Sequence, residues 1–176
     1  MKAMDPVPFS SLYDLANLSE AGTEVSVVAN TEQRARMARW ADLEAVDDFE
    51  ARIFLRQPFP GRFTYDAKLS AGITQTCVVT LGPVRSHLVL DISRTLHLSK
   101  IPRGTKIAPQ EFTPTADEDP EEIHDSRYDL ASPLLEEFAL VIDPYPRCAG
   151  VAFEPPLDEG ETESPFGVLK STKGQS

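Results

Sequence analysis

Apolar and polar residues alternate along most of the chain between Phe49 and Leu98, which is the period of a half-buried β-strand. Two such runs, 49–56 and 62–69, flank the turn-forming residues 57–61 and predict a hairpin. A register centred on Phe59 satisfies both faces of this hairpin. Its apolar pairs are Leu55 with Phe63, Ile53 with Tyr65, Ala51 with Ala67 and Phe49 with Leu69. Its outward pairs are Arg52 with Asp66, Glu50 with Lys68 and, beside the turn, Arg56 with Arg62.

The same pattern predicts further strands at 24–29, 73–81 and 84–98. A helix is expected from Glu32 to Leu43, capped by Asn30 or Thr31, with Gln33 placed to close its first turn. A second helix should follow Asp129, with one apolar stripe made of Leu130, Leu134, Phe138 and Val141. The expected fold is α+β, an antiparallel meander packed by two helices and able to curl into a partly open barrel.

Residues 99–128 break this pattern with four prolines and an acidic run at 117–122, and we interpret them as a long mobile excursion. Residues 1–156 are expected to form a single domain. Residues 157–176 are expected to form a flexible linker and a terminal docking peptide, whose apolar residues are Phe166, Val168 and Leu169.

Charge is distributed unevenly over the 176 residues, whose formal net charge is −11. Residues 1–106 contain 13 basic and 12 acidic side chains, whereas residues 107–176 contain 4 basic and 16 acidic ones. The body is therefore nearly neutral, and the last third is acidic enough to bind a basic partner or to shield a basic face. No apolar run reaches the roughly 18 residues of a membrane span, and the N-terminus lacks a targeting pattern, so we expect a cytoplasmic protein.

Common catalytic signatures are missing from the sequence. It has no Gly-rich phosphate loop and no Ser nucleophile elbow, and its three histidines are dispersed. Cys77 is expected in the middle of a strand on the buried face, where burial would raise its pKa, and Cys148 follows in a Pro-rich loop. We therefore predict no catalytic residue, no cofactor, no metal and no small-molecule substrate. An enzyme that uses Cys77 is a weaker alternative.

Three segments of the chain resemble the YceD family of large ribosomal RNA subunit accumulation proteins, in its alphaproteobacterial form. They are 75–84, which begins Gln-Thr-Cys, 136–147, which ends Asp-Pro-Tyr-Pro-Arg, and the terminal 164–169. The resemblance implies a role in the synthesis, processing or stability of 23S ribosomal RNA. Many relatives have a second cysteine three positions after the first, where this chain has Thr80.

Two binding modes would serve such a role, and the sequence leaves both open. In one, basic and aromatic side chains contact large-subunit ribosomal RNA or its precursor. The candidate residues are Arg34, Arg36, Arg39, Arg52, Phe54, Arg56, Arg62 and Lys68. In the other, the acidic last third holds a basic large-subunit ribosomal protein. Any single arginine in this set is more often simply a solvated surface residue.

Overall fold

The fold is known from a computed structural model, which describes residues 7–19, 21–99 and 120–151. Its main sheet has five strands in the order β2-β3-β4-β5-β6. They are β2 (Thr23–Val28), β3 (Ala45–Phe59), β4 (Arg62–Thr76), β5 (Pro83–Leu98) and β6 (Glu121–Ile123). Neighbouring strands are antiparallel, except that β6 runs parallel to β5. A second, two-stranded sheet pairs β1 (Leu12–Asp14) with β7 (Arg127–Asp129).

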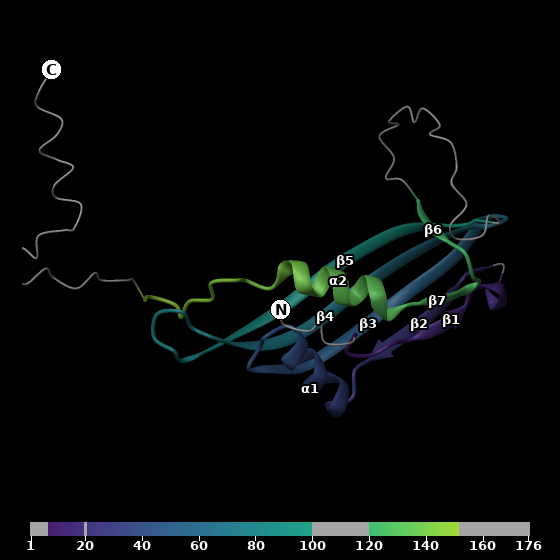
Figure 1. Cartoon of the computed structure of the whole chain (residues 1–176). Helices are drawn as coiled ribbons and strands as arrows, with labels where there is room; N and C mark the ends of the chain where they lie inside the picture. The colour runs from purple at the N-terminus through teal and green to yellow at the C-terminus, as the bar shows by residue number, and fades with distance from the viewer. Residues whose placement is uncertain (1–6, 20, 100–119, 152–176) are drawn as a thin grey trace, which may run out of the picture.

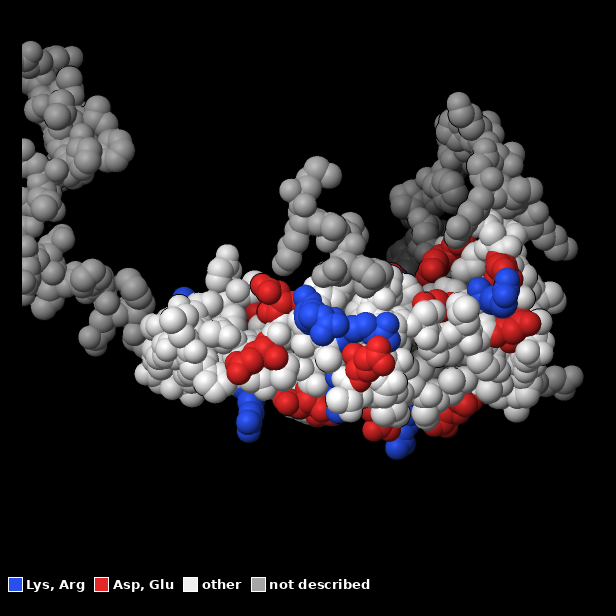
Figure 2. Space-filling view, turned by 60° about the horizontal axis from the view of Figure 1, so that its bottom comes forward, with Lys and Arg blue, Asp and Glu red and all other residues white. Residues whose placement is uncertain are grey.

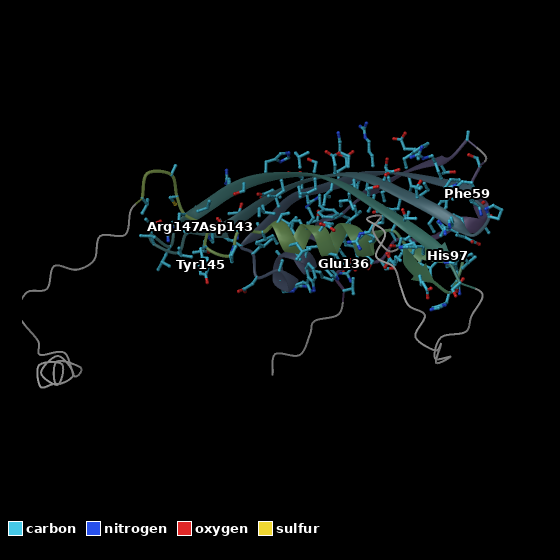
Figure 3. The ribbon with its side chains drawn as sticks, turned by 90° about the horizontal axis from the view of Figure 1, so that it is seen from above. Phe59, His97, Glu136, Asp143, Tyr145 and Arg147 are labelled. Carbon is cyan, nitrogen blue, oxygen red and sulfur yellow. The ribbon has the colours of Figure 1, made fainter. Side chains whose placement is uncertain are left out.

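The remaining elements are helical: a 3-10 turn, η1 (Leu15–Asn17), and the helices α1 (Thr31–Trp40) and α2 (Ala131–Val141). Both helices lie on the same side of the main sheet (Figures 1 and 3). The sheet is open, because its edge strands β2 and β6 do not pair with each other. The predicted α+β class is therefore confirmed, without closure into a barrel. Neither α1 nor α2 is long and apolar enough to cross a membrane.

Helix α1 begins at a capping box, as the sequence predicts. The Asn30 side chain accepts a hydrogen bond from the Gln33 amide at 2.9 Å, and the Gln33 side chain accepts one from the Asn30 amide at 2.8 Å. These two bonds satisfy amides that the first turn of a helix leaves without partners. Met37 and Ala38 are buried, so α1 presents one apolar stripe to the core.

The hairpin of β3 and β4 has a register two residues away from the predicted one. Leu55 lies opposite Tyr65, Arg52 opposite Lys68, and Arg56 opposite Thr64. The predicted pairs are therefore wrong, including the pair of Arg56 with Arg62. The loop shortens to Pro60 and Gly61, and the φ of Gly61 is 74°. A bulge in β3 between Arg56 and Phe59 absorbs the one extra residue of that strand. Pro58 lies within this bulge and has no amide to donate to the ladder. Because the slip is even, every side chain keeps its predicted face.

Three further boundaries differ from the prediction. The predicted strands 62–69 and 73–81 are not separate, because β4 runs unbroken to Thr76. Residues 77–82 form a turn instead of strand, closed by bonds from the Cys77 amide to the Gly82 carbonyl at 2.8 Å and from the Leu81 amide to the Cys77 carbonyl at 3.0 Å. Part of the predicted excursion is also regular, since 121–123 and 127–129 are strands β6 and β7. Residues 100–119 of the predicted excursion and the predicted linker and terminal docking peptide, 157–176, lie outside the described residues.

The core lies between the sheet and α2. The ring of Phe49 from β3 meets that of Phe138 from α2 edge-to-face, with centroids 5.6 Å apart. The buried Tyr65 hydroxyl donates to the Leu130 carbonyl at 2.9 Å and so joins β4 to the start of α2. Asp129 accepts bonds from the amides of Ser11 at 2.7 Å and Ala131 at 3.0 Å. The helix begins one residue later than the sequence predicts, since Leu130 and not Asp129 directly precedes α2, but Asp129 still satisfies the Ala131 amide in its first turn.

Packing of α2 can be tested with two truncations on this helix. Phe138→Ala should lower the free energy of unfolding by about 3–5 kcal/mol, because it removes a fully buried ring from the sheet. Leu140→Ala is the matched control; the Leu140 side chain is 77% exposed, so the change should stay within about 0.5 kcal/mol. Urea unfolding of both variants measures the difference. Equal losses would show that α2 does not pack as described.

Candidate functional site

The side of the sheet opposite the helices carries the sheet residues that the sequence singles out. Arg52, Phe54, Arg56 and Lys68 are all exposed and lie on adjacent strands, β3 and β4. We call this surface the open face, and it also includes Thr64, Asp66, Asp91 and Ser93. Side chains project from it on the side of the sheet that no helix covers (Figure 3). The period-two pattern thus places four of the candidate residues on one surface.

Acidic partners neutralise part of the open face. Arg56 pairs with Asp66 at 3.0 Å, and its guanidinium lies 5.4 Å from the centre of the Phe54 ring. Lys68 pairs with Asp91 at 3.4 Å. Arg52 has no ion pair within residues 7–19, 21–99 and 120–151. The open face is therefore a surface of mixed charge, and exposed pairs of this kind contribute only about 0–1 kcal/mol each to stability.

Arg62 lies at the far end of this surface. It pairs in register with Phe59 of β3 and with His97 of β5, and it is not opposite Arg56. The Phe59 side chain is 66% exposed. Figure 3 labels Phe59 and His97 at the same end of the sheet. A cation, a histidine and an uncovered aromatic ring thus meet at this rim.

The three arginines of α1 are not part of the open face. Arg36 and Arg39 are exposed on the helix, and Arg34 donates to the Ala29 carbonyl at 3.1 Å. Because α1 lies on the helix-covered side of the sheet, these arginines form a separate set. Basic and acidic groups lie side by side over the face turned forward in Figure 2, without a continuous basic area. The predicted binding residues therefore divide between two surfaces.

At the opposite end of the sheet, two segments distant in sequence meet. The Gln75 side chain donates to the Asp143 carbonyl at 2.8 Å, and the Val78 amide donates to the Pro146 carbonyl at 2.9 Å. The Cys148 amide donates to the Cys77 sulfur at 3.3 Å. The first two bonds join 75–84 to 136–147, which are two of the segments that resemble the YceD family. The sequence named both segments but gave no sign that they touch.

These segments border a groove of about 580 Å³ that we call the end groove. Its lining comes from the loop after α1, the end of β4 and the chain after α2. The lining residues are Ala41, Asp42, Leu43, Glu44, Gln75, Thr76, Val78, Ile142, Asp143, Pro144 and Pro146. Apolar and acidic groups both line it, a combination suited to an apolar segment that carries a basic group.

Large apolar side chains are left uncovered at this end of the molecule. Val78 is 46% exposed, Leu81 77% and Tyr145 70%. Asp143, Tyr145 and Arg147 lie together at the end of the sheet away from Phe59 (Figure 3). The sequence did not predict this surface, because its alternating pattern places Leu81 in a strand that does not extend so far. The available signal was the run Asp-Pro-Tyr-Pro-Arg, which places an aromatic ring between two prolines.

Cys77 differs most from its sequence-based expectation. It lies at the start of the turn after β4 and not within a strand, although its side chain is fully buried. Its pKa is lowered to about 6, first by hydrogen bonding of the Thr80 side chain and then by the amides of Thr80 and Cys148. The two amide nitrogens lie 3.4 Å and 3.3 Å from the sulfur. Burial raises the pKa, as expected, but the donors outweigh it. The predicted rise is therefore wrong.

The lowered pKa of Cys77 gives a testable pH dependence. In a Cys148→Ser variant, the ultraviolet absorbance of the Cys77 thiolate should appear with a midpoint near pH 6. The pKa of a thiol in an unfolded chain is about 8.5, so the lowered pKa of Cys77 stabilises the folded chain fully above that pH. This contribution is lost as the pH falls through about 6. Adding Thr80→Val should move the midpoint upward, because it removes the leading donor. A midpoint near 8.5 in the Cys148→Ser chain would contradict the assignment.

Among the described residues, no group of three or more His, Cys, Asp and Glu side chains could hold a metal ion. Comparisons of the chain with protein-family models, with curated proteins and with solved structures found no match. The YceD family therefore remains a resemblance carried by three sequence segments.

Proposed function

We propose that this chain is a non-enzymatic binding factor in biogenesis of the large ribosomal subunit, where it supports the synthesis, processing or stability of 23S ribosomal RNA in the cytoplasm. The observation that carries the proposal is the contact between 75–84 and 136–147. These two segments, which share the family resemblance, lie together at one end of the molecule, and each forms one wall of the end groove. This is what a shared binding surface requires.

Burial of Cys77 supports a binding role over catalysis. Its sulfur is the one group whose pKa is strongly shifted toward nucleophilic chemistry among the described residues, yet its side chain has no exposed surface. A nucleophile must reach the reacting atom of its substrate. The thiolate is therefore out of reach of a substrate in this conformation, which disfavours an enzyme that uses Cys77.

The open face is the surface best suited to contact RNA. Arg52 and Arg62 are exposed cations without ion pairs in the described part of the chain. The Phe59 ring opposite Arg62 is uncovered, and Phe54 near Arg52 is partly exposed, with the Arg56 guanidinium 5.4 Å from its ring centre. Phosphates bind the cations and bases stack on the rings. The second candidate, a basic large-subunit ribosomal protein, is favoured by a different observation. Acidic side chains outnumber basic ones among the described residues as well.

Loss of the protein tests the cellular role. A deletion strain should contain less mature 23S ribosomal RNA relative to 16S ribosomal RNA, because the large subunit would be assembled or protected less efficiently. The ratio is measured on total RNA during growth at normal and at low temperature. Expression of the protein from a plasmid is the control and should restore the ratio. An unchanged ratio in the deletion strain would remove the proposed role.

Charge reversal separates the two partners. Arg52→Glu with Arg62→Glu should weaken binding to 23S ribosomal RNA and flatten its dependence on salt, by about one unit of slope for each phosphate contact removed. Arg36→Glu with Arg39→Glu makes the same charge change on α1 and should leave the affinity within about twofold. Filter binding over a range of salt concentrations measures both. The protein partner would be established instead by two results together. The wild-type chain would not bind RNA, and both it and the open-face variant would bind basic large-subunit ribosomal proteins.

A further inference from the structure

Two cysteines that are 71 positions apart in the sequence lie against each other beside the end groove. Cys77 begins the turn between β4 and β5, and Cys148 belongs to the chain that follows α2. The Cys148 amide nitrogen is 3.3 Å from the Cys77 sulfur. Thr80 contacts both residues, since its amide nitrogen is 3.4 Å from the Cys77 sulfur and its hydroxyl oxygen is 3.5 Å from the Cys148 sulfur. Both cysteines are free thiols.

The geometry points to a reversible disulfide between Cys77 and Cys148, formed by exchange with an oxidised low-molecular-weight thiol such as glutathione disulfide. A disulfide needs the two backbones close together, with their Cβ atoms about 3.5–4.5 Å apart. The hydrogen bond from the Cys148 amide to the Cys77 sulfur holds the Cys148 backbone against this sulfur. Rotation about the Cα–Cβ bond of Cys148, whose sulfur now lies 3.5 Å from the Thr80 hydroxyl, would bring that sulfur toward Cys77.

The two thiols have different accessibilities, which sets the order of the steps. The Cys77 side chain is fully buried, whereas Cys148 is partly exposed, so the oxidant meets Cys148 first. After losing its proton, the Cys148 sulfur attacks one sulfur of glutathione disulfide. This step forms a mixed disulfide and releases one glutathione thiolate.

Cys77 then resolves the mixed disulfide. Its thiolate attacks the Cys148 sulfur, forms the internal S–S bond and expels the second glutathione thiolate. Two electrons pass from the protein thiols to glutathione disulfide, and the two protons they release are taken up by the two glutathione thiolates. The donors around Cys77, led by Thr80, keep its sulfur largely ionised near neutral pH, which favours this second step.

The disulfide would covalently join two of the three walls of the end groove. One wall, with Gln75, Thr76 and Val78, comes from the end of β4 and the turn that follows it. The other, with Asp143 and Pro146, comes from the chain after α2. In the reduced chain, hydrogen bonds such as that from the Val78 amide to the Pro146 carbonyl connect these walls. Oxidation would therefore prevent these walls from separating, and reduction of the disulfide would allow them to separate again. The inference does not depend on the proposed ribosomal function.

Equilibration of the full-length protein in glutathione buffers tests the inference. After alkylation and mass analysis, wild-type protein should lose both reactive thiols as the proportion of glutathione disulfide rises, and it should carry no bound glutathione. Peptide mapping should identify the Cys77–Cys148 link. Cys77→Ala should instead accumulate glutathione on Cys148, because the resolving thiol is gone. Cys148→Ser should form neither the link nor the adduct on buried Cys77.

Two further measurements use chains that need no change at either cysteine. The oxidised wild-type protein should melt roughly 5 °C or more above the reduced protein, and a reductant should abolish the difference. Thr80→Val should slow the loss of bound glutathione several-fold at neutral pH, because the Cys77 thiolate is then less populated. Stable glutathione on Cys148 of the wild-type chain, dimers linked through Cys148, or equally ready disulfide formation in denaturant would each overturn the inference.

Discussion

Pairing of β3 with β4 is the interaction on which the rest of this structure depends. The two 15-residue strands are joined by the tight loop at Pro60 and Gly61 and stay in register from Phe59 to Ala45 apart from two bulges. Their inward residues form the floor on which α2 packs, through contacts such as that of Phe49 with Phe138. Their outward residues form the open face. The ends of the hairpin also define the two ends of the molecule, with Phe59 at one and the end groove at the other.

The faces of these strands could be predicted from the sequence, but their register could not. Alternation decides which side chains point inward, and a slip of two residues leaves that assignment unchanged. Charge favoured the wrong register, because that register sets Arg52 opposite Asp66 and Glu50 opposite Lys68, whereas the actual one sets Arg52 opposite Lys68. In the structure Asp66 instead pairs diagonally with Arg56 of β3, and Lys68 pairs with Asp91 of β5. The bulge at Pro58 decided the register, and bulges leave little trace in an alternating pattern.

The end groove was missed for a different reason. Its walls come from three parts of the chain, and two of the bonds that join them use backbone carbonyls at Asp143 and Pro146. Any residue can supply a carbonyl, so composition and spacing carry no signal for such a contact. The same limit applied to Cys77, whose burial was predicted correctly. Its hydrogen-bond donors come from the turn at Thr80 and from distant Cys148, and together they reverse the direction of its pKa shift.

The open face and the end of the sheet that carries the end groove would recognise a partner through different physical interactions. On the open face, binding of a phosphate by Arg56 or Lys68 would release Asp66 or Asp91, whose carboxylates would then face the polyanion. Net attraction there must come mainly from Arg52, Arg62 and stacking on the rings of Phe54 and Phe59, so the affinity should depend only moderately on salt. At the opposite end of the sheet, burial of Val78 in the end groove and of the exposed Leu81 and Tyr145 near it would dominate, and apolar burial is nearly insensitive to moderate salt. The salt dependence of a partner's affinity therefore identifies the surface it uses, before any residue is changed.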